Sequence, residues 1–192
     1  MTKPVVIGIA GGSASGKTTL AERLEQALAG VRVLVIHMDH YFFKERPHMV
    51  APITRLEYED HNHPTSFDLV QLISDLDAAI AASEVQVIIL EGLLVLQNDD
   101  LRQRLDLKLF VDAQADERIV RRTRRNMARG LGFDEITNFY LDCVRYRHQE
   151  YVEPSRWHAD LVMNGSQFSE LGLDIVAAWV HRQVASQPQE PA

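Results

Sequence analysis

The chain of 192 residues has a single cysteine, Cys143. One cysteine cannot form an internal disulfide, which suits a reducing compartment, so we expect a cytoplasmic protein. Cys143 lies in a predicted helix with no base partner evident in the sequence. We therefore interpret it as a packed thiol and not as a nucleophile.

Long apolar runs and an excess of positive charge are also absent. The longest later apolar run, residues 85–96, is interrupted by Gln86 and Glu91 and is too short to span a bilayer. The apolar run after Lys3 is too short for a secretory signal. With 20 Lys and Arg against 27 Asp and Glu, general nucleic-acid binding is disfavoured. We expect neither a membrane nor a nucleic acid as partner.

A glycine-rich segment at residues 11–18 fits the phosphate-binding pattern G-x-x-x-x-G-K-[ST], between an apolar run and a helical pattern. Glycines let successive backbone N–H groups point at one anion, and the helix N-terminus adds partial positive charge. Lys17 can then reach the β- and γ-phosphates, and the Thr18 hydroxyl can ligate Mg²⁺. The segment predicts a nucleoside triphosphate site formed by Gly11, Gly12, Ser13, Ala14, Ser15, Gly16, Lys17 and Thr18.

Apolar segments at residues 5–10, 32–37, 86–90, 107–111 and 160–163 are predicted to form buried strands. Helical patterns at 17–29, 67–82, 116–129, 135–152 and 170–184 separate most of them. This alternation predicts an α/β protein of the P-loop NTPase fold, with a mostly parallel five-stranded sheet and helices on both faces. We expect one domain over residues 1–185 and a disordered tail at 186–192. Thr65 or Ser66 is the expected N-cap of the second helix, and Pro154 the expected end of the fourth.

The connection at residues 38–64 has no clear periodicity but is rich in aromatic and histidine side chains. A connection of this length in a compact domain is usually functional or disordered. Ligands of open α/β sheets bind at the carboxyl ends of the strands, and this segment follows such an end. We therefore predict a substrate loop at 38–64, whose rings and imidazoles are His40, Tyr41, Phe42, Phe43, His48, Tyr58, His61 and His63.

Two carboxylates follow predicted strands near the phosphate loop. Glu91 ends an apolar run and can bind Mg²⁺ directly or through water. Asp39 follows the second strand, where it can accept the proton of an attacking hydroxyl or help to hold the metal. The chain lacks the Asn-Lys-x-Asp motif of GTPases and the Asp-Glu strand end of motor-type ATPases.

Arginines are concentrated in residues 118–129, where spacings of three and four place most of them on one helical stripe. Such a stripe is a solvated face, a nucleic-acid patch, or a lid whose guanidiniums neutralise the transferred phosphoryl group. Gly130 and Gly132 would let a lid move. We predict an Arg-rich lid at about 118–133, carrying Arg118, Arg121, Arg122, Arg124, Arg125 and Arg129.

In this order, the motifs resemble the uridine kinase branch of the phosphoribulokinase/uridine kinase family, over about residues 5–165. The loop at 11–19 is similar to the family's glycine-rich loop, and residues 38–42 resemble its Asp-x-[Phe/Tyr]-Tyr segment. His63-Pro64 with Phe67-Asp68 resembles the Asp-His-Pro-Asp-Ala-Phe-Asp motif. Residues 90–92, 110–125 and 153–160 resemble the metal-linked glutamate, the lid helix and the closing segment.

The resemblance implies an ATP- and Mg²⁺-dependent kinase of pyrimidine salvage, which phosphorylates the 5′-hydroxyl of a small ribonucleoside such as uridine or cytidine. It also implies a homo-oligomer, either a dimer or a tetramer. By resemblance Asp39 is the base, Thr18, Glu91 and Asp39 hold the metal, and Lys17, Thr19, Arg122, Arg125 and Arg129 act on the nucleotide. The implied substrate contacts are Asp39, Tyr41, Phe42, His63 and Arg122.

Two departures from the family concern the recognition of the base. Uridine kinases carry a β-hairpin before the glutamate strand, whereas here residues 78–83 lead almost directly into 85–87. The lid motif Arg-Gly-Arg becomes Arg129-Gly130-Leu131. Two alternatives therefore stay open: a nicotinamide riboside kinase, whose motifs resemble residues 41–43 and 146–147, and an ATP-binding regulator without acceptor turnover.

Overall fold

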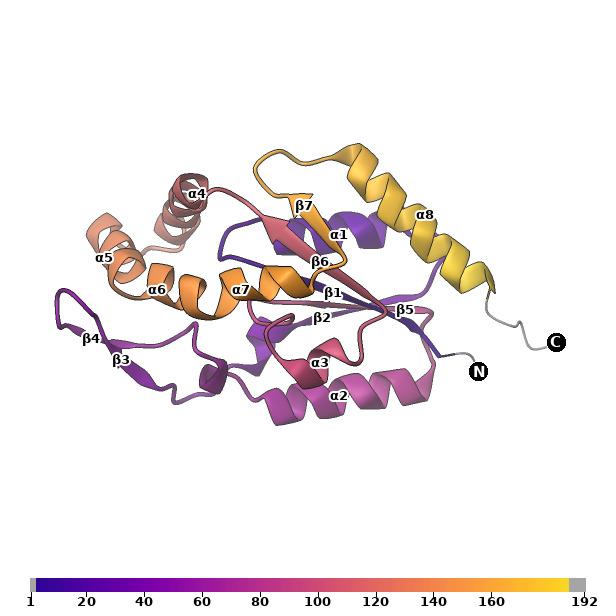
Figure 1. Cartoon of the computed structure of the whole chain (residues 1–192), viewed down its shortest axis with the longest axis horizontal. Helices are drawn as coiled ribbons and strands as arrows, with labels where there is room; N and C mark the ends of the chain where they lie inside the picture. Colours follow the sequence, from indigo (N-terminus) through magenta and orange to yellow (C-terminus); the bar gives the residue numbers. More distant parts are fainter. Residues whose placement is uncertain (1–2, 187–192) are drawn as a thin grey trace.

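The computed structural model describes residues 3–186 and contains a five-stranded sheet in the order β2-β5-β1-β6-β7. Its strands are β1 (Val5–Gly11), β2 (Val33–His37), β5 (Val87–Glu91), β6 (Leu107–Asp112) and β7 (Leu161–Asn164). All neighbouring strands pair in parallel, so their carboxyl ends meet at one edge (Figure 1). The five predicted strands and the α/β fold are confirmed, each strand lying within one residue of its expected bounds.

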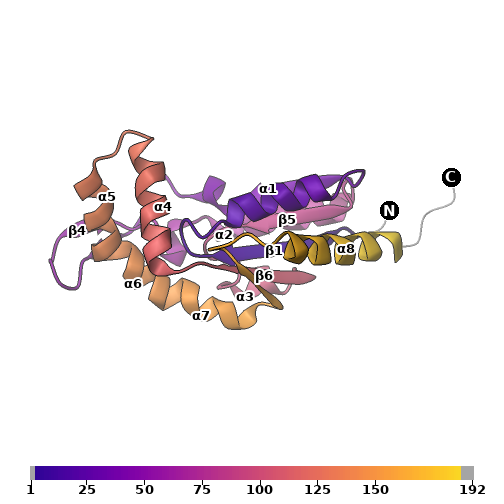
Figure 2. The ribbon, with the colours of Figure 1, turned by 90° about the horizontal axis from the view of Figure 1, so that it is seen from above.

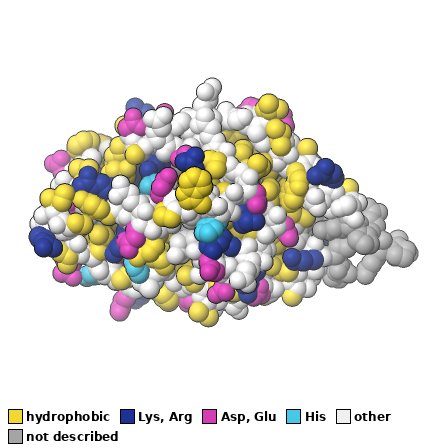
Figure 3. Space-filling model, in the orientation of Figure 1, with side chains coloured by type: hydrophobic (Ala, Val, Ile, Leu, Met, Phe, Trp, Pro, Cys, Tyr) yellow, Lys and Arg dark blue, Asp and Glu magenta, His cyan; other side chains and the backbone are white. Residues whose placement is uncertain are grey.

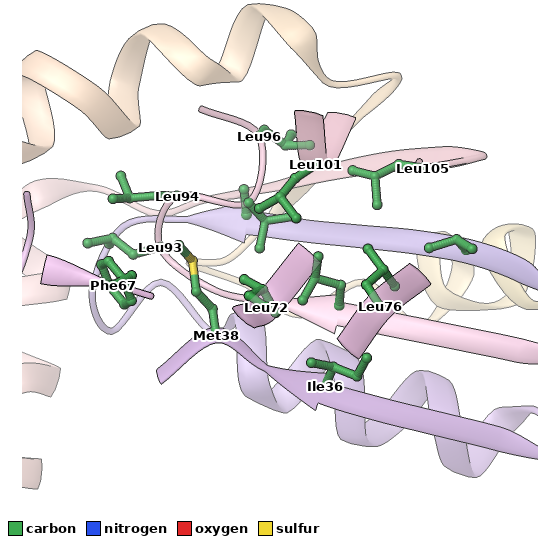
Figure 4. Close-up of a cluster of buried hydrophobic side chains, with 14 of the residues drawn as sticks. Ile36, Met38, Phe67, Leu72, Leu76, Leu93, Leu94, Leu96, Leu101 and Leu105 are labelled. Carbon is green, nitrogen blue, oxygen red and sulfur yellow. The ribbon is translucent and has the colours of Figure 1, made fainter. Parts of the chain in front are cut away.

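Helices cover both faces of the sheet (Figure 1). α1 (Lys17–Ala27) and α8 (Glu170–Ser186) pack on one face, and α2 (Leu69–Ala82) with α3 (Asp99–Arg102) packs on the other. Because successive strand residues point to opposite faces, Val6 joins the α2 side and Ile7 the α1 side. Figure 4 shows the α2 side, where Leu72 and Leu76 lie near Ile36 of β2. Apolar side chains on both faces explain why the strands are continuously apolar in sequence.

One helical run extends further than the sequence predicted. After α4 (Ala115–Met127), the chain is helical from α5 (Phe133–Phe139) to His158, through α6 (Arg145–Arg147) and α7 (Glu153–Ser155). Two π-helical segments, Tyr140–Val144 and His148–Val152, interrupt the α-helical hydrogen bonding. The prediction that Pro154 ends the helix is wrong, because Pro154 lies in the first turn of α7, directly after a π segment. Pro154 has no N–H to donate within this run, and it directly follows the π segment and Glu153, where the regular hydrogen bonding is already interrupted.

The segment at 38–64 contains a small sheet that the sequence did not reveal. β3 (His48–Val50) and β4 (Glu57–Glu59) form an antiparallel hairpin, flanked by 3₁₀ turns at Met38–Tyr41 and Pro64–Ser66. The N-cap of α2 is Asp68, whose side chain accepts from the backbone N–H of Gln71 at 2.9 Å. The expected caps Thr65 and Ser66 are wrong, since both lie in the preceding 3₁₀ turn.

Two further expectations concern the surface and the C-terminal end. No helix of residues 3–186 is long and apolar enough to cross a membrane. On the face shown in Figure 3, basic and acidic side chains are interspersed. Of the tail expected at 186–192, Ser186 is the last residue of α8. Residues 187–192 lie outside the described part of the chain.

Candidate active site

The predicted phosphate loop joins β1 to α1 at the carboxyl edge of the sheet. Gly11 and Gly16 have φ angles of 146° and 105°, which glycine adopts far more readily than other residues. A Cβ on Gly11 would lie 2.3 Å from the carbonyl oxygen of Val111. A Cβ on Gly12 would lie 2.6 Å from the guanidinium of Arg118. Gly11 is therefore required by both its φ angle and its close packing, and Gly16 by its φ angle alone.

Lys17 and Thr18 begin α1 and face the carboxylate at the end of β5. Lys17 Nζ donates to the carbonyl oxygen of Gly12 at 3.2 Å, across the loop. Thr18 Oγ1 donates to Glu91 Oε1 at 3.2 Å, and the same carboxylate oxygen lies 2.8 Å from His37 Nδ1. Burial lowers the pKa of Lys17, while the nearby carboxylates of Glu91 and Asp39 act to raise it. The predicted base, metal ligands and phosphate-binding lysine thus lie around one place.

The oxygen donors at this place fit a magnesium ion. A hydroxyl and a buried carboxylate, those of Thr18 and Glu91, already meet, and Asp39 lines the same cavity. Among residues 3–186 no group of three or more His, Cys, Asp or Glu side chains is arranged to hold a metal on its own. Mg²⁺ suits such a site, since it commonly uses one or two protein oxygens and completes its shell with phosphate oxygens and water.

The arginine stripe of α4 divides between the cavity and other surroundings. Arg121, Arg122, Arg125 and Arg129 line the cavity, whereas Arg118 is buried against Gly12 and donates to the carbonyl oxygen of Ala113. Arg124 is exposed and outside the cavity lining. Arg124 therefore fits the solvated face, Arg118 is a buried structural residue, and the lid role of the four cavity arginines stays a prediction.

The cavity arginines crowd together beside the phosphate loop. Arg122 Nη1 donates to Ser13 Oγ at 2.7 Å. Burial, together with the charge of Arg125, lowers the pKa of Arg122 to about 10. Burial and the charge of Arg129 lower the pKa of Arg125 in the same way. Cations packed closely enough to depress one another's pKa form a site for a polyanion.

The cavity has a volume of about 1180 Å³ and extends from the phosphate loop to the β3–β4 hairpin. Aromatic rings line its hairpin end, with centroid separations of 5.7 Å for Tyr58 and Phe139, 5.8 Å for His61 and Phe139, and 6.0 Å for Phe42 and His61. Burial lowers the pKa of His61, which keeps its imidazole neutral at neutral pH. The polar side chains of this end are Glu59, Asn62, Glu135 and Asn138.

The sequence identified only part of this end. Phe42 lies in the cavity as expected, and the aromatic content of residues 38–64 had signalled Tyr58 and His61. The sequence did not indicate Phe139, because an apolar residue in a predicted helix is normally interpreted as a core residue. Glu135 and Asn138 gave none either, since polar helical residues are common on surfaces.

Two predicted substrate residues are not among the side chains that line the cavity. The hydroxyl of Tyr41 donates to Asp75 Oδ2 on α2 at 2.9 Å, and its ring packs against the core of the α2 side. His63 caps the 3₁₀ turn through its Nδ1, which lies 2.8 Å from Thr65 Oγ1, and its ring contacts that of Tyr151. Both side chains make structural contacts, Tyr41 with α2 and His63 with the following turn and Tyr151.

A smaller hollow of about 240 Å³ adjoins the main cavity at the start of α1. It shares Gly16, Thr19 and Arg121 with the main cavity, and Ser15 lines it as well. The guanidinium of Arg121 donates to the carbonyl oxygens of Gly165 and Ser166 at 2.6 and 3.0 Å. Sequence analysis missed this site; its remaining lining residues are Leu20, Val111, Met163, Asn164, Phe168 and Ser169.

Cys143 is buried, as predicted. Burial raises the pKa of its thiol to about 12, and the carboxylates of Asp60 and Asp142 add to this effect. The thiolate form needed for nucleophilic chemistry is therefore disfavoured at neutral pH.

Comparison with known proteins identifies the family. Residues 6–71 and 74–170 match the Phosphoribulokinase / Uridine kinase family. A uridine kinase of Chloroflexus aurantiacus is 33% identical over 97% of this chain and 99% of its own length, and one of Bacillus cereus is 34% identical over 91% and 92%. A structure described as a possible uridine kinase from Bacillus stearothermophilus has the same fold, with a TM-score of 0.56 and 21% identity over 84% of this chain and 89% of its own. The chain belongs to the Phosphoribulokinase / Uridine kinase family and is a phosphotransferase that acts on a hydroxyl group.

Proposed function

We propose that this protein is an ATP-dependent kinase that transfers the γ-phosphate to the 5′-hydroxyl of a ribonucleoside, with uridine or cytidine as the acceptor. The observation that carries the proposal is one cavity with two chemically different ends. Lys17, Glu91 and Arg122 lie at the phosphate-loop end, and aromatic and amide side chains lie at the hairpin end. A donor phosphate and an organic acceptor fit these two ends.

The triphosphate would lie along the phosphate loop, with Lys17 and the α4 arginines around its terminal phosphates. Thr18 and Glu91 would hold Mg²⁺, which neutralises charge on the β- and γ-phosphates when it is bound. The nucleotide base would occupy the smaller hollow, since that hollow adjoins the loop through Gly16 and Thr19. Arg122 and Arg125 would balance the charge that spreads over the transferred phosphoryl group, acting from a lid at 118–133.

Asp39 is the group proposed to orient the acceptor hydroxyl and accept its proton. It lines the cavity beside Lys17 and follows β2 at the carboxyl edge of the sheet. Phosphoryl transfer depends on placing the hydroxyl in line with the γ-phosphate, and a carboxylate hydrogen-bonded to that hydroxyl does this.

Nicotinamide riboside is the second candidate acceptor. Only residues 83–86 separate α2 from β5, so the family hairpin at this place is missing. The cavity instead offers the rings of Phe42, Tyr58 and Phe139, and Leu131 stands in its lining where an arginine is expected. Aromatic rings stack on a cationic pyridinium ring as well as on a pyrimidine.

The test is ADP release with ATP and Mg²⁺, measured without acceptor and with uridine, cytidine or nicotinamide riboside. Stimulation by uridine or cytidine is the expected result, and stimulation by nicotinamide riboside alone would favour the second candidate. Asp39→Asn should reduce acceptor-dependent turnover at least about 100-fold and leave ATP binding within about twofold of wild type. Asp174→Asn, an exposed carboxylate of α8, is the matched control.

Two outcomes would contradict the proposal. ATP binding without stimulation by any acceptor would favour the regulatory alternative. Near-normal turnover of Asp39→Asn would show that Asp39 is not the group that accepts the proton of the acceptor hydroxyl.

A further inference from the structure

The β3–β4 hairpin is attached to the helical run that follows α4, although 84 or more residues separate the contacting parts. Thr54 Oγ1, in the turn of the hairpin, donates to Asp142 Oδ2 at 2.7 Å. Tyr58 Oη, on β4, donates to the same oxygen at 2.8 Å. Figures 1 and 2 both show the hairpin beside α5 and α6.

Asp142 is itself buried, with a relative exposure of 6%, and lies in the middle of the π-helical segment Tyr140–Val144. Among the described residues its carboxylate has no hydrogen bond apart from those to Thr54 and Tyr58, and no salt bridge. Burying a carboxylate without a cation is unfavourable, so these two hydrogen bonds are what compensates it. A π segment interrupts a regular helix and is frequent at functional sites.

A second contact attaches the chain just after β4. Arg147 Nε donates to Asp60 Oδ2 at 2.6 Å, and Asp60 is almost completely buried. The other carboxylate oxygen of Asp60 accepts from the backbone N–H of Asn62 at 2.9 Å. The two attachments lie within or directly beside residues 58–62, which include side chains that line the hairpin end of the cavity: Tyr58, Glu59, His61 and Asn62.

Asn62 points to a ligand at this end. Its side chain is 6% exposed and lines the cavity, yet its Nδ2 atom is buried without a hydrogen-bond partner. A buried amide donor without a partner costs stability, and an oxygen of the acceptor would satisfy it. Asn62 can serve in this way only while the hairpin holds its position.

We propose that Asp142 is a positioning residue for the acceptor: through Thr54 and Tyr58 it holds the β3–β4 hairpin where Tyr58, His61 and Asn62 form one wall of the acceptor end. This inference rests on the proposed kinase function. Asp142 does not line the cavity itself. Its effect is therefore on acceptor binding, transmitted through the hairpin, and not on the nucleotide.

The experiment compares wild type with Asp142→Ala, the conservative Asp142→Asn, and Asp134→Ala as an exposed carboxylate control on α5. Asp142→Ala should raise the KM for uridine at least about tenfold, which corresponds to about 1.4 kcal/mol. The KM for ATP should stay within about twofold of wild type. Asp142→Asn should largely restore the acceptor KM, because its amide can still pair with both hydroxyls.

Amide hydrogen exchange of residues 48–62 supplies a readout independent of turnover. Asp142→Ala should speed exchange in this segment and leave residues 11–18 unchanged, since only the hairpin loses its attachment. The variant Thr54→Val removes one of the two hydroxyls at a residue outside the cavity lining and leaves the carboxylate its hydrogen bond from Tyr58. It should shift the acceptor KM in the same direction, also when Asp142→Ala fails to fold.

The outcomes separate the two proposals. If wild type shows no acceptor-stimulated ADP release, the proposed function and this inference both fail. If wild type is stimulated but the Asp142→Ala and Thr54→Val variants keep a normal acceptor KM, the inference alone is overturned. An equal rise in the KM values for ATP and acceptor would also overturn it, because that pattern indicates general damage to the fold.

Discussion

Arg122 is a cation in surroundings that disfavour its charge. Replacing it should raise the stability of the protein without nucleotide and lower its turnover. The fall of its pKa from 12.5 to about 10 corresponds to about 3 kcal/mol of destabilisation of the folded protein at neutral pH. Arg122→Met keeps most of the side-chain volume and removes the charge. It also removes the hydrogen bond to Ser13, worth about 1.5 kcal/mol or somewhat more. The variant without nucleotide should therefore be about 1–2 kcal/mol more stable than wild type.

Nucleotide should stabilise wild type more than it stabilises Arg122→Met. In wild type, Mg²⁺ and ATP supply the anion that the crowded arginines lack, so binding should add stability. Arg122→Met should gain much less from the same nucleotide concentration. Its turnover should fall about 1,000-fold, the lower limit for an arginine that stabilises a phosphoryl transition state. Urea unfolding with and without MgATP, together with ADP release, measures all three effects.

Arg124→Met is the matched control, because Arg124 belongs to the same helix but is exposed and outside the cavity lining. It should change neither stability nor turnover appreciably. Two results would refute the reasoning. One is an Arg122→Met protein that is less stable than wild type without nucleotide, and the other is a variant that keeps turnover within about tenfold of wild type.

Two further predictions follow from the loop and its surroundings. Glu91→Gln keeps the shape of the side chain but removes a charge beside Thr18. The Mg²⁺ concentration needed for half-maximal activity should therefore rise about tenfold. An unchanged concentration would exclude Glu91 as a ligand. Burial lowers the pKa of His148 from 6.5 to about 4, so the unfolded state binds more protons between these values and stability falls as the pH decreases. Between pH 7 and pH 5 the free energy of unfolding, measured in urea, should fall by about 2 kcal/mol because of this residue. His148→Gln should abolish this fall. An equal fall in the variant would show that other groups cause it.

The phosphate end of the cavity could be predicted because its determinants are local in sequence. Gly11, Gly16, Lys17 and Thr18 lie within eight consecutive residues, preceded by a buried strand and followed by a helix. The close approach of Gly11 to Val111 leaves room for hydrogen only, and the motif records that constraint directly. The central strands could be predicted for a related reason, since both faces of β1 and β5 are covered and every position in them is buried.

The acceptor end could not be predicted in the same way, because long-range contacts build it. β3 and β4 have three residues each, too few to show an alternating pattern. Tyr58 meets Phe139 and Asp142 only after the helical run folds back over the hairpin. A single Asp in a helix is indistinguishable in sequence from a solvated one, and the π-helical segment that places Asp142 has no sequence signature of its own.

These two kinds of determinant imply different consequences of sequence change. A substitution at Gly11 or Lys17 acts on the triphosphate, which every member of a kinase family must bind. A substitution in the contact between residues 48–62 and 133–147 acts on the acceptor wall and leaves the phosphate loop in place. Because the hairpin depends on a few hydrogen bonds, such as those to Asp142 and Asp60, small changes there can reshape the wall at little cost to the sheet. Acceptor choice in this chain should therefore respond to changes in that contact, while catalysis responds to changes in the loop.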